Sequence, residues 1–163
     1  MNRLLDEHLE ATYFPEYQSL RDQLMGLLVD DELRFAVPGN PMLGALCREM
    51  GEVEQSYVDA LRAFRQDFAY RHPERAIQGD VRGLRTWFGE LDRALAAALE
   101  GLTEEDVRDR LIVRGDDPDG FTVGVRQELD IYREALLIFY GKVIVYLRAM
   151  GKPVPPQWQD WIG

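Results

Sequence analysis

The residues Thr122–Met150, TVGVRQELDIYREALLIFYGKVIVYLRAM, decide the fold of this 163-residue chain. Thr122 is expected to cap a long helix here, and Gly151 with the following Lys152-Pro153 is expected to end it. Apolar side chains recur in this stretch at alternating spacings of four and three residues, the pattern of one buried helix face: Val125, Leu129, Tyr132, Leu136, Phe139, Val143, Tyr146 and Met150.

A second apolar stripe covers much of the opposite side of this helix, at Leu137, Ile138, Gly141, Ile144 and Val145. A helix that is apolar on two faces must be covered on both, either by other helices of the chain or by a second subunit. We expect a homodimer built partly on this stripe, with Gly141 permitting close approach. The alternative is that two other helices of the same chain cover it.

Two further helices are predicted before residue 71. The first runs to about Val29, and Pro15 either opens it in its first turn or kinks a helix already under way in residues 1–14. The second is expected to run from Pro41, after Asn40 as its cap, to about Tyr70. Its apolar seam is Leu46, Met50, Val53, Tyr57, Ala60, Phe64 and Phe68.

The remainder of the chain is predicted as a third long helix, a short one and a tail. Asp80 is a candidate cap for the third helix, and Thr103–Asp106 resembles a capping box that starts a short helix. Residues 114–120 form a polar turn-rich segment that lacks the acidic ligands of a calcium loop at the required positions. The tail 153–163 is expected to pack back through Trp158, Trp161 and Ile162. These elements predict an all-α four-helix bundle in a single domain, residues 1–163.

Composition excludes several classes of function. The net charge of −10 and the pI near 4.7 argue against binding to nucleic acid or to an anionic membrane surface. No apolar run approaches the roughly 20 residues that a membrane span needs. A single cysteine, Cys47, cannot form an intramolecular disulfide, and a small half-buried side chain is the simplest interpretation of it. Together these features favour the cytoplasm.

Residues able to bind a metal or catalyse a reaction are few. The only histidines, His8 and His72, lie outside any Glu-x-x-His motif of a di-iron site. Glu49 lies at the edge of the core stripe of the second helix, whereas Glu52 and Glu54 fall on positions expected to be more exposed. Glu49 either faces the bundle interior, where it must be paired, hydrogen-bonded or protonated, or leans outward to solvent.

Two segments resemble the DinB-like (DinB/YfiT-like) four-helix bundles. Residues 141–148, GKVIVYLR, followed by Gly151 and Pro153-Val154-Pro155, are similar to the last helix and tail of that family. Residues 46–54 are similar to its second helix. The resemblance implies an up-down-down-up bundle that is often dimeric and that in many members binds a divalent metal through three histidines. Several members of that family are linked to thiol-dependent transferase or isomerase chemistry. The family name refers to damage-inducibility rather than to DNA binding.

The family's metal ligands are missing from this sequence. The resemblance places the three histidine positions on Glu49, Ala135 and Phe139, and one carboxylate does not hold a metal. We therefore expect no metal and no cofactor.

Two functions remain in competition. The first is a cytoplasmic, homodimeric binding or stress-associated protein that holds a small apolar or cationic ligand near Glu49, Tyr57, Tyr132 and Phe139. The alternative is a metal-independent or divergent enzyme of the family, with Glu49 as acid or base and Tyr132 or Tyr57 as hydrogen-bond donors. A metal-dependent thiol transferase is disfavoured by the missing histidines.

Overall fold

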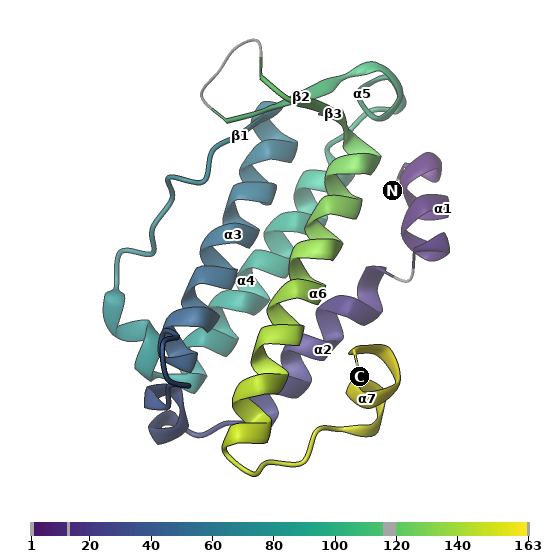
Figure 1. Ribbon diagram of the computed structural model, residues 1–163. Coiled ribbons are helices and arrows are strands. Elements are labelled where there is room, and N and C mark those ends of the chain that lie inside the picture. The colour runs from purple at the N-terminus through teal and green to yellow at the C-terminus, as the bar shows by residue number, and fades with distance from the viewer. Residues whose placement is uncertain (1, 13, 116–119, 163) are drawn as a thin grey trace.

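A computed structural model describes residues 2–12, 14–115 and 120–162. Four long helices form a four-sided bundle, in which α3 packs against α4 and α6, and α2 packs against the same two helices (Figure 1). Helices α3 and α4 run in one direction and α2 and α6 in the other, which confirms the all-α, up-down-down-up arrangement. The bounds are α2 (Phe14–Leu27), α3 (Leu43–Ala63), α4 (Val81–Glu100) and α6 (Val125–Ala149).

Shorter elements close the two ends of the bundle. A three-stranded sheet of order β1-β2-β3 lies at the end where α3 finishes and α6 begins (Figure 1); β1 pairs parallel with β2, and β2 antiparallel with β3. The strands are β1 (Arg65–Gln66), β2 (Leu111–Arg114) and β3 (Thr122–Gly124). The short helices are α1 (Arg3–Ala11), α5 (Glu104–Asp109) and α7 (Pro156–Ile162), with 3₁₀ turns at η1 (Asp30–Arg34) and η2 (Arg75–Gly79).

Local signals for helix ends are confirmed where they depend on neighbouring residues alone. Asp80 Oδ1 accepts a hydrogen bond from Gly83 N at 2.9 Å and caps α4. Thr103 and Asp106 form the expected capping box of α5. Gly151 has a φ of 68°, the left-handed conformation that ends α6. Pro15 lies in the first turn of α2, which is separate from α1.

Helix α3 is shorter than expected, because it ends at Ala63 rather than near Tyr70. Phe64 adopts a left-handed conformation with a φ of 54°, and its carbonyl oxygen accepts a hydrogen bond from Val113 N at 3.1 Å. Pairing with β2 therefore replaces the next helical turn. Phe68, which was expected on the apolar seam of the helix, lies beyond its end and is 44% exposed.

The starts of α3 and α6 also differ from the prediction. Thr122 belongs to β3, and Gly124 occupies the N-cap position of α6, so the strand takes the residues expected to begin the helix. At α3 the N-cap position is Met42 rather than Asn40. The Asn40 side-chain nitrogen instead donates to the Pro38 carbonyl at 3.1 Å, within the preceding turn.

The C-terminal segment packs back onto the bundle as predicted. Trp158 is completely buried, and its ring centroid lies 5.3 Å from that of Tyr140. The expectations for the side chains of Trp161 and Ile162, and for loop residues 116–119, fall outside what the structure describes. Cys47 is fully enclosed rather than half-buried, and burial raises the pKa of its thiol to about 12. Within the described ranges, no helix has the length and apolarity to cross a bilayer.

Candidate functional site

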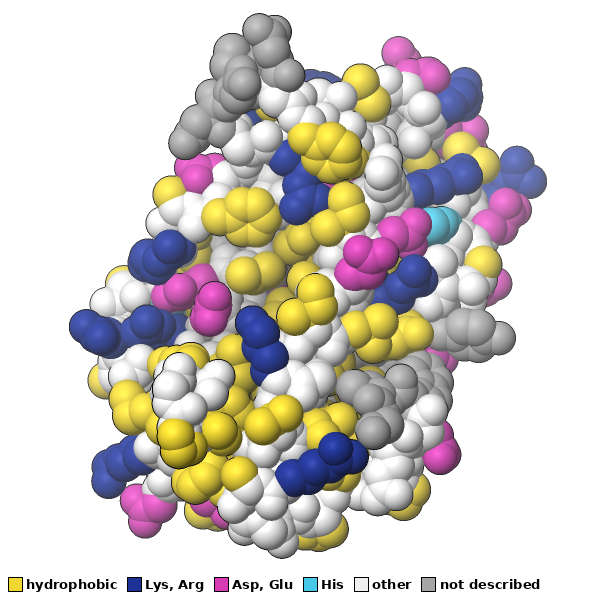
Figure 2. Space-filling model, viewed as in Figure 1, with side chains coloured by type: hydrophobic (Ala, Val, Ile, Leu, Met, Phe, Trp, Pro, Cys, Tyr) yellow, Lys and Arg dark blue, Asp and Glu magenta, His cyan; other side chains and the backbone are white. Residues whose placement is uncertain are grey.

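A groove of about 170 Å³ lies between α3 and α6, and we call it the α3–α6 groove. Two further hollows adjoin it, one of about 310 Å³ beside Tyr146 and one of about 410 Å³ beside Arg71, and Glu49 borders all three. Hydrophobic side chains gather on this face of the molecule, interrupted by single basic and acidic groups (Figure 2). The α3–α6 groove is lined by Leu46, Glu49, Met50, Val53, Ala135, Ile138, Phe139 and Lys142.

Glu49 lies at the rim of the groove, exposed to solvent. The interior position considered from the sequence is wrong, because Leu46 and Met50 occupy the inward-facing positions of this turn of α3. Across the groove Lys142 is also exposed. Among the described residues, neither Glu49 nor Lys142 has a hydrogen-bond or ion-pair partner. The groove thus presents one free carboxylate and one free ammonium above an apolar floor.

The four candidate binding residues separate into two pairs. Phe139 is buried and lines the groove beside Glu49. Tyr132 is fully buried inside the bundle, with its ring centroid 4.8 Å from that of Tyr57, and neither tyrosine borders the hollows at Glu49. An acid at Glu49 with a tyrosine as hydrogen-bond donor, the set required by the enzyme hypothesis, is therefore not brought together.

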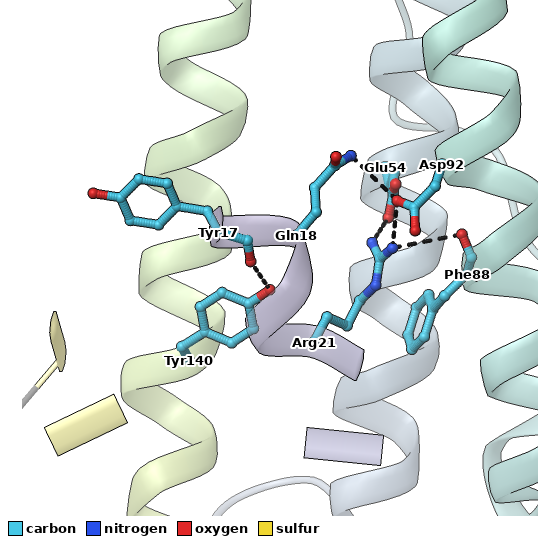
Figure 3. Close-up of polar contacts among 7 residues, drawn as sticks. All are labelled: Tyr17, Gln18, Arg21, Glu54, Phe88, Asp92 and Tyr140. Carbon is cyan, nitrogen blue, oxygen red and sulfur yellow. Dashed lines mark hydrogen bonds and ion pairs between the residues drawn. The ribbon is translucent and has the colours of Figure 1, made fainter. Parts of the chain in front are cut away.

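A buried ion-pair network occupies the centre of the bundle (Figure 3). Arg21 of α2 is fully enclosed and forms an ion pair with Glu54 of α3, which is fully enclosed as well. Its other terminal nitrogen lies 2.5 Å from Asp92 Oδ1 of α4, and the same oxygen accepts a hydrogen bond from Gln18 at 3.2 Å. The guanidinium also lies 4.5 Å from the centroid of the Phe88 ring. The network ties three helices of the bundle together.

A solved structure has the same architecture: the crystal structure of YjoA, a DinB-like protein from Bacillus subtilis, at 2.30 Å resolution. The two sequences are 19% identical, the alignment covers 89% of this chain and 94% of that one, and the TM-score is 0.66. The chain has a DinB-like fold. No family model matches the sequence, and no curated protein matches it either.

The DinB-like fold brings together the three positions to which the resemblance assigns metal-binding histidines. Glu49, Ala135 and Phe139 all line the α3–α6 groove. Their side chains do not fit a metal ion, because one carboxylate is their only ligand group. Both histidines make contacts elsewhere in the bundle: His8 lies 3.1 Å from Asp130, and the His72 ring lies tilted against Trp87, with the ring centroids 4.4 Å apart. Within the described ranges, no cluster of three His, Cys, Asp or Glu side chains is placed to bind a metal.

Burial controls the ionisation of the central network. Desolvation raises the pKa of Glu54 to about 8, although the positive charge of Arg21 opposes the shift and the charge of Asp92 adds to it. A protonated Glu54 leaves one cation and one anion, so the enclosed group is neutral overall. Burial also raises the pKa of Tyr132, and the charge of Glu54 contributes. The Tyr132 hydroxyl is a neighbour of the Glu54 carboxyl group, and the interaction between them contributes to the pKa of both.

The sequence placed Glu52 and Glu54 on exposed positions, and this prediction is wrong for both. Glu52 is 8% exposed, and its Oε1 accepts a hydrogen bond from His72 N at 3.1 Å. Glu54 belongs to a second heptad stripe, in which every residue is buried: Cys47, Met50, Glu54, Tyr57 and Leu61. The position of Glu54 inside an otherwise apolar stripe is therefore the feature of the sequence from which the buried ion pair could have been predicted.

A second enclosed ion pair fastens the small sheet to the bundle. Arg114 of β2 lies 3.2 Å from Glu128 of α6, which is 1% exposed. Burial raises the pKa of Glu128, and the charge of Arg114 opposes the shift. The guanidinium lies 5.9 Å from the ring centroids of both Tyr57 and Phe68. These contacts explain why Tyr57 is part of a structural cluster rather than of the groove.

Proposed function

We propose that the α3–α6 groove binds a small molecule with an apolar body and a cationic group, and that the chain acts as a binding protein. The observation that carries the proposal is the free carboxylate of Glu49 where three hollows meet, two of which have mainly apolar walls. A free charge beside an apolar surface favours a ligand of opposite charge, because the pair gains energy when the ligand excludes water.

The shape and charge of the groove restrict the ligand further. About 170 Å³ accommodates a ring or a short alkyl chain over Phe139 and Ala135, and larger ligands extend into the adjoining hollows. Lys142 repels a cationic group on its own side of the groove. The cation of the ligand is therefore directed to Glu49, and the apolar body to the floor.

The proposal includes a cytoplasmic homodimer. Ile144, a member of the second apolar stripe of α6, is buried within its own chain, so helices of the same chain cover part of the stripe. Ile138 and Val145 remain 61% and 53% exposed. Two large apolar side chains on one helix face support a contact with a second copy.

The ligand proposal is tested with phenethylammonium as the probe and 3-phenylpropanoate as its anionic counterpart. We expect the ammonium probe to bind with a dissociation constant in the millimolar range and to shift the amide NMR signals of Ala135 and Phe139. Replacing Glu49→Gln should weaken binding about two- to fivefold, since an exposed charge contributes roughly 0.5–1 kcal/mol. Replacing Ala135→Trp fills the groove and should abolish binding.

The control is Glu100→Gln, which removes an exposed carboxylate at the far end of α4 and should leave binding unchanged. Equal binding of the two probes, or signal changes confined to residues outside the groove, would refute the proposal.

A further inference from the structure

The hollow of about 410 Å³ beside the α3–α6 groove lies between α3 and the segment that follows it, and we call it the arginine hollow. The chain after β1 runs back along α3 (Figure 1), so that Arg71 of this segment lines the same hollow as Arg48 and Glu52 of the helix. Glu49 borders both the arginine hollow and the groove. A ligand held at Glu49 can therefore reach the charged groups of this hollow.

Glu52 is a buried carboxylate that fixes the two arginines of the hollow. It is 8% exposed, with its Oε1 3.3 Å from Arg48 Nε and its Oε2 3.9 Å from Arg71 Nε. The Nη1 of Arg71 also donates to the carbonyl oxygens of Phe68 and Tyr70, at 2.7 and 2.6 Å. The two guanidinium groups are thus attached to different oxygens of one carboxylate.

The charges of this cluster do not balance. Arg48 and Arg71 share Glu52, so the three side chains together carry one excess positive charge. A guanidinium has five N–H donors, and the contacts just described use only Nε of Arg48 and only Nε and Nη1 of Arg71, so both groups keep donors for a ligand. Guanidinium groups recognise carboxylates through paired hydrogen bonds. One excess positive charge matches a singly charged carboxylate better than a doubly charged phosphate.

We propose that the arginine hollow binds the carboxylate of a free apolar α-amino acid, whose ammonium group lies at Glu49 and whose side chain lies in the α3–α6 groove. Glu49 borders both spaces, so the two charged groups of the ligand bind close together. An α-amino acid carries them on one carbon atom, together with its side chain. The N-terminal residue of a peptide has the ammonium group but lacks the carboxylate. This inference rests on the proposed function and narrows its ligand to one chemical class.

The matched probes are phenethylammonium and L-phenylalanine, which differ only in the carboxylate. In NMR titrations of the full chain we expect L-phenylalanine to bind about five- to tenfold more tightly, because two guanidinium groups contact its carboxylate. It should shift the amide signals of Glu52 and Arg71 in addition to those of the groove. 3-Phenylpropanoate should bind more weakly than either probe, since its carboxylate approaches the free Glu49 without an ammonium group to neutralise it.

Variants of the charged groups locate the carboxylate of the ligand. Arg48→Gln and Arg71→Gln should each reduce the preference for L-phenylalanine over phenethylammonium to about twofold or less. Continued binding of phenethylammonium shows that a variant keeps its fold and its groove. Glu49→Gln should improve the binding of 3-phenylpropanoate, because the repelling carboxylate is removed. The control is Arg126→Gln, which removes an exposed guanidinium of α6 outside the hollow and should leave the preference unchanged.

The outcomes separate this inference from the proposed function. If phenethylammonium binds in the groove and L-phenylalanine binds no more tightly, the amino-acid ligand is wrong and the proposed function stands. Equal effects of Arg48→Gln and Arg126→Gln on the preference would lead to the same conclusion. If phenethylammonium does not bind in the groove at all, the proposed function is overturned, and the amino-acid ligand with it.

Discussion

At the scale of single residues, Arg21 and Glu54 present the main electrostatic problem of the fold. Enclosing two charges without compensation is costly, and each depends on the other and on Asp92 (Figure 3). The high pKa of Glu54, about 8, means that the network holds a proton at neutral pH. Arg21 thus keeps Asp92 as its anionic partner, and Arg21, Glu54 and Asp92 together carry no net charge.

This proton makes stability depend on pH. The pKa of Glu54 is about 8 in the folded chain and about 4.5 as its ordinary value, so between these values only the folded state holds the proton. The free energy of unfolding therefore falls as the pH rises through this window. Between pH 5 and pH 8 we expect the native protein to lose about 2–4 kcal/mol more than Glu54→Gln, which cannot titrate, as measured by urea denaturation. Equal losses would show that Glu54 does not carry the proton.

At the scale of the elements, α3 is positioned by contacts that its own periodicity does not reveal. Its first turn approaches η2 so closely that a Cβ atom at Gly44 would lie 1.7 Å from the Gln78 carbonyl oxygen. Its last turn ends where the sheet begins. The groove residues on the outer face of α3 are therefore held by a helix fixed at both ends.

Substitution of Gly44 tests this close approach. Gly44→Ala requires a backbone shift of α3 or η2, because the contacted atom belongs to the main chain, and we expect a loss of about 2–4 kcal/mol in the free energy of unfolding. The matched variant Gly89→Ala, on α4, meets only the end of the Arg93 side chain at 3.6 Å. It should be stabilised by about 0.5–1 kcal/mol. Similar effects of the two substitutions in chemical denaturation would contradict the close approach.

At the scale of the whole molecule, segments outside the four long helices fix the bundle at two places. The sheet is fixed at one end by Arg114 and Glu128. Near the other end, the segment after α6 returns and buries Trp158 against Tyr140, whose hydroxyl donates to the Tyr17 carbonyl of α2 at 2.7 Å (Figure 3). The tail therefore stabilises the contact between α2 and α6.

Removal of the buried indole should release this segment. For Trp158→Ala we expect a loss of about 2–4 kcal/mol in the free energy of unfolding, since a large enclosed side chain is deleted. Amide hydrogen exchange should be fast throughout residues 156–162, while the amides of α3 remain protected. Unchanged protection of the tail would mean that contacts other than those of Trp158 hold it.

The sequence alone determined the bundle, because the periodicity of a helix and the residues that cap it are local. The seam from Val125 to Met150, the cap at Asp80 and the stop at Gly151 were predicted from neighbouring residues and are present. The position of Phe139 in the groove beside Glu49 followed from the resemblance of two segments.

Only the tertiary structure decided the ends of α3 and the identity of the buried acid. The strand β1 pairs with residues 113–114, and no local pattern indicates a contact across nearly fifty positions. Glu49 and Glu54 are five residues apart and so point about 140° apart around the helix, and the rotation of α3 about its axis decides which of the two enters the core. That rotation is set by Arg21 on α2 and Asp92 on α4, because burial of Glu54 is tolerated only where a cation from another helix meets it.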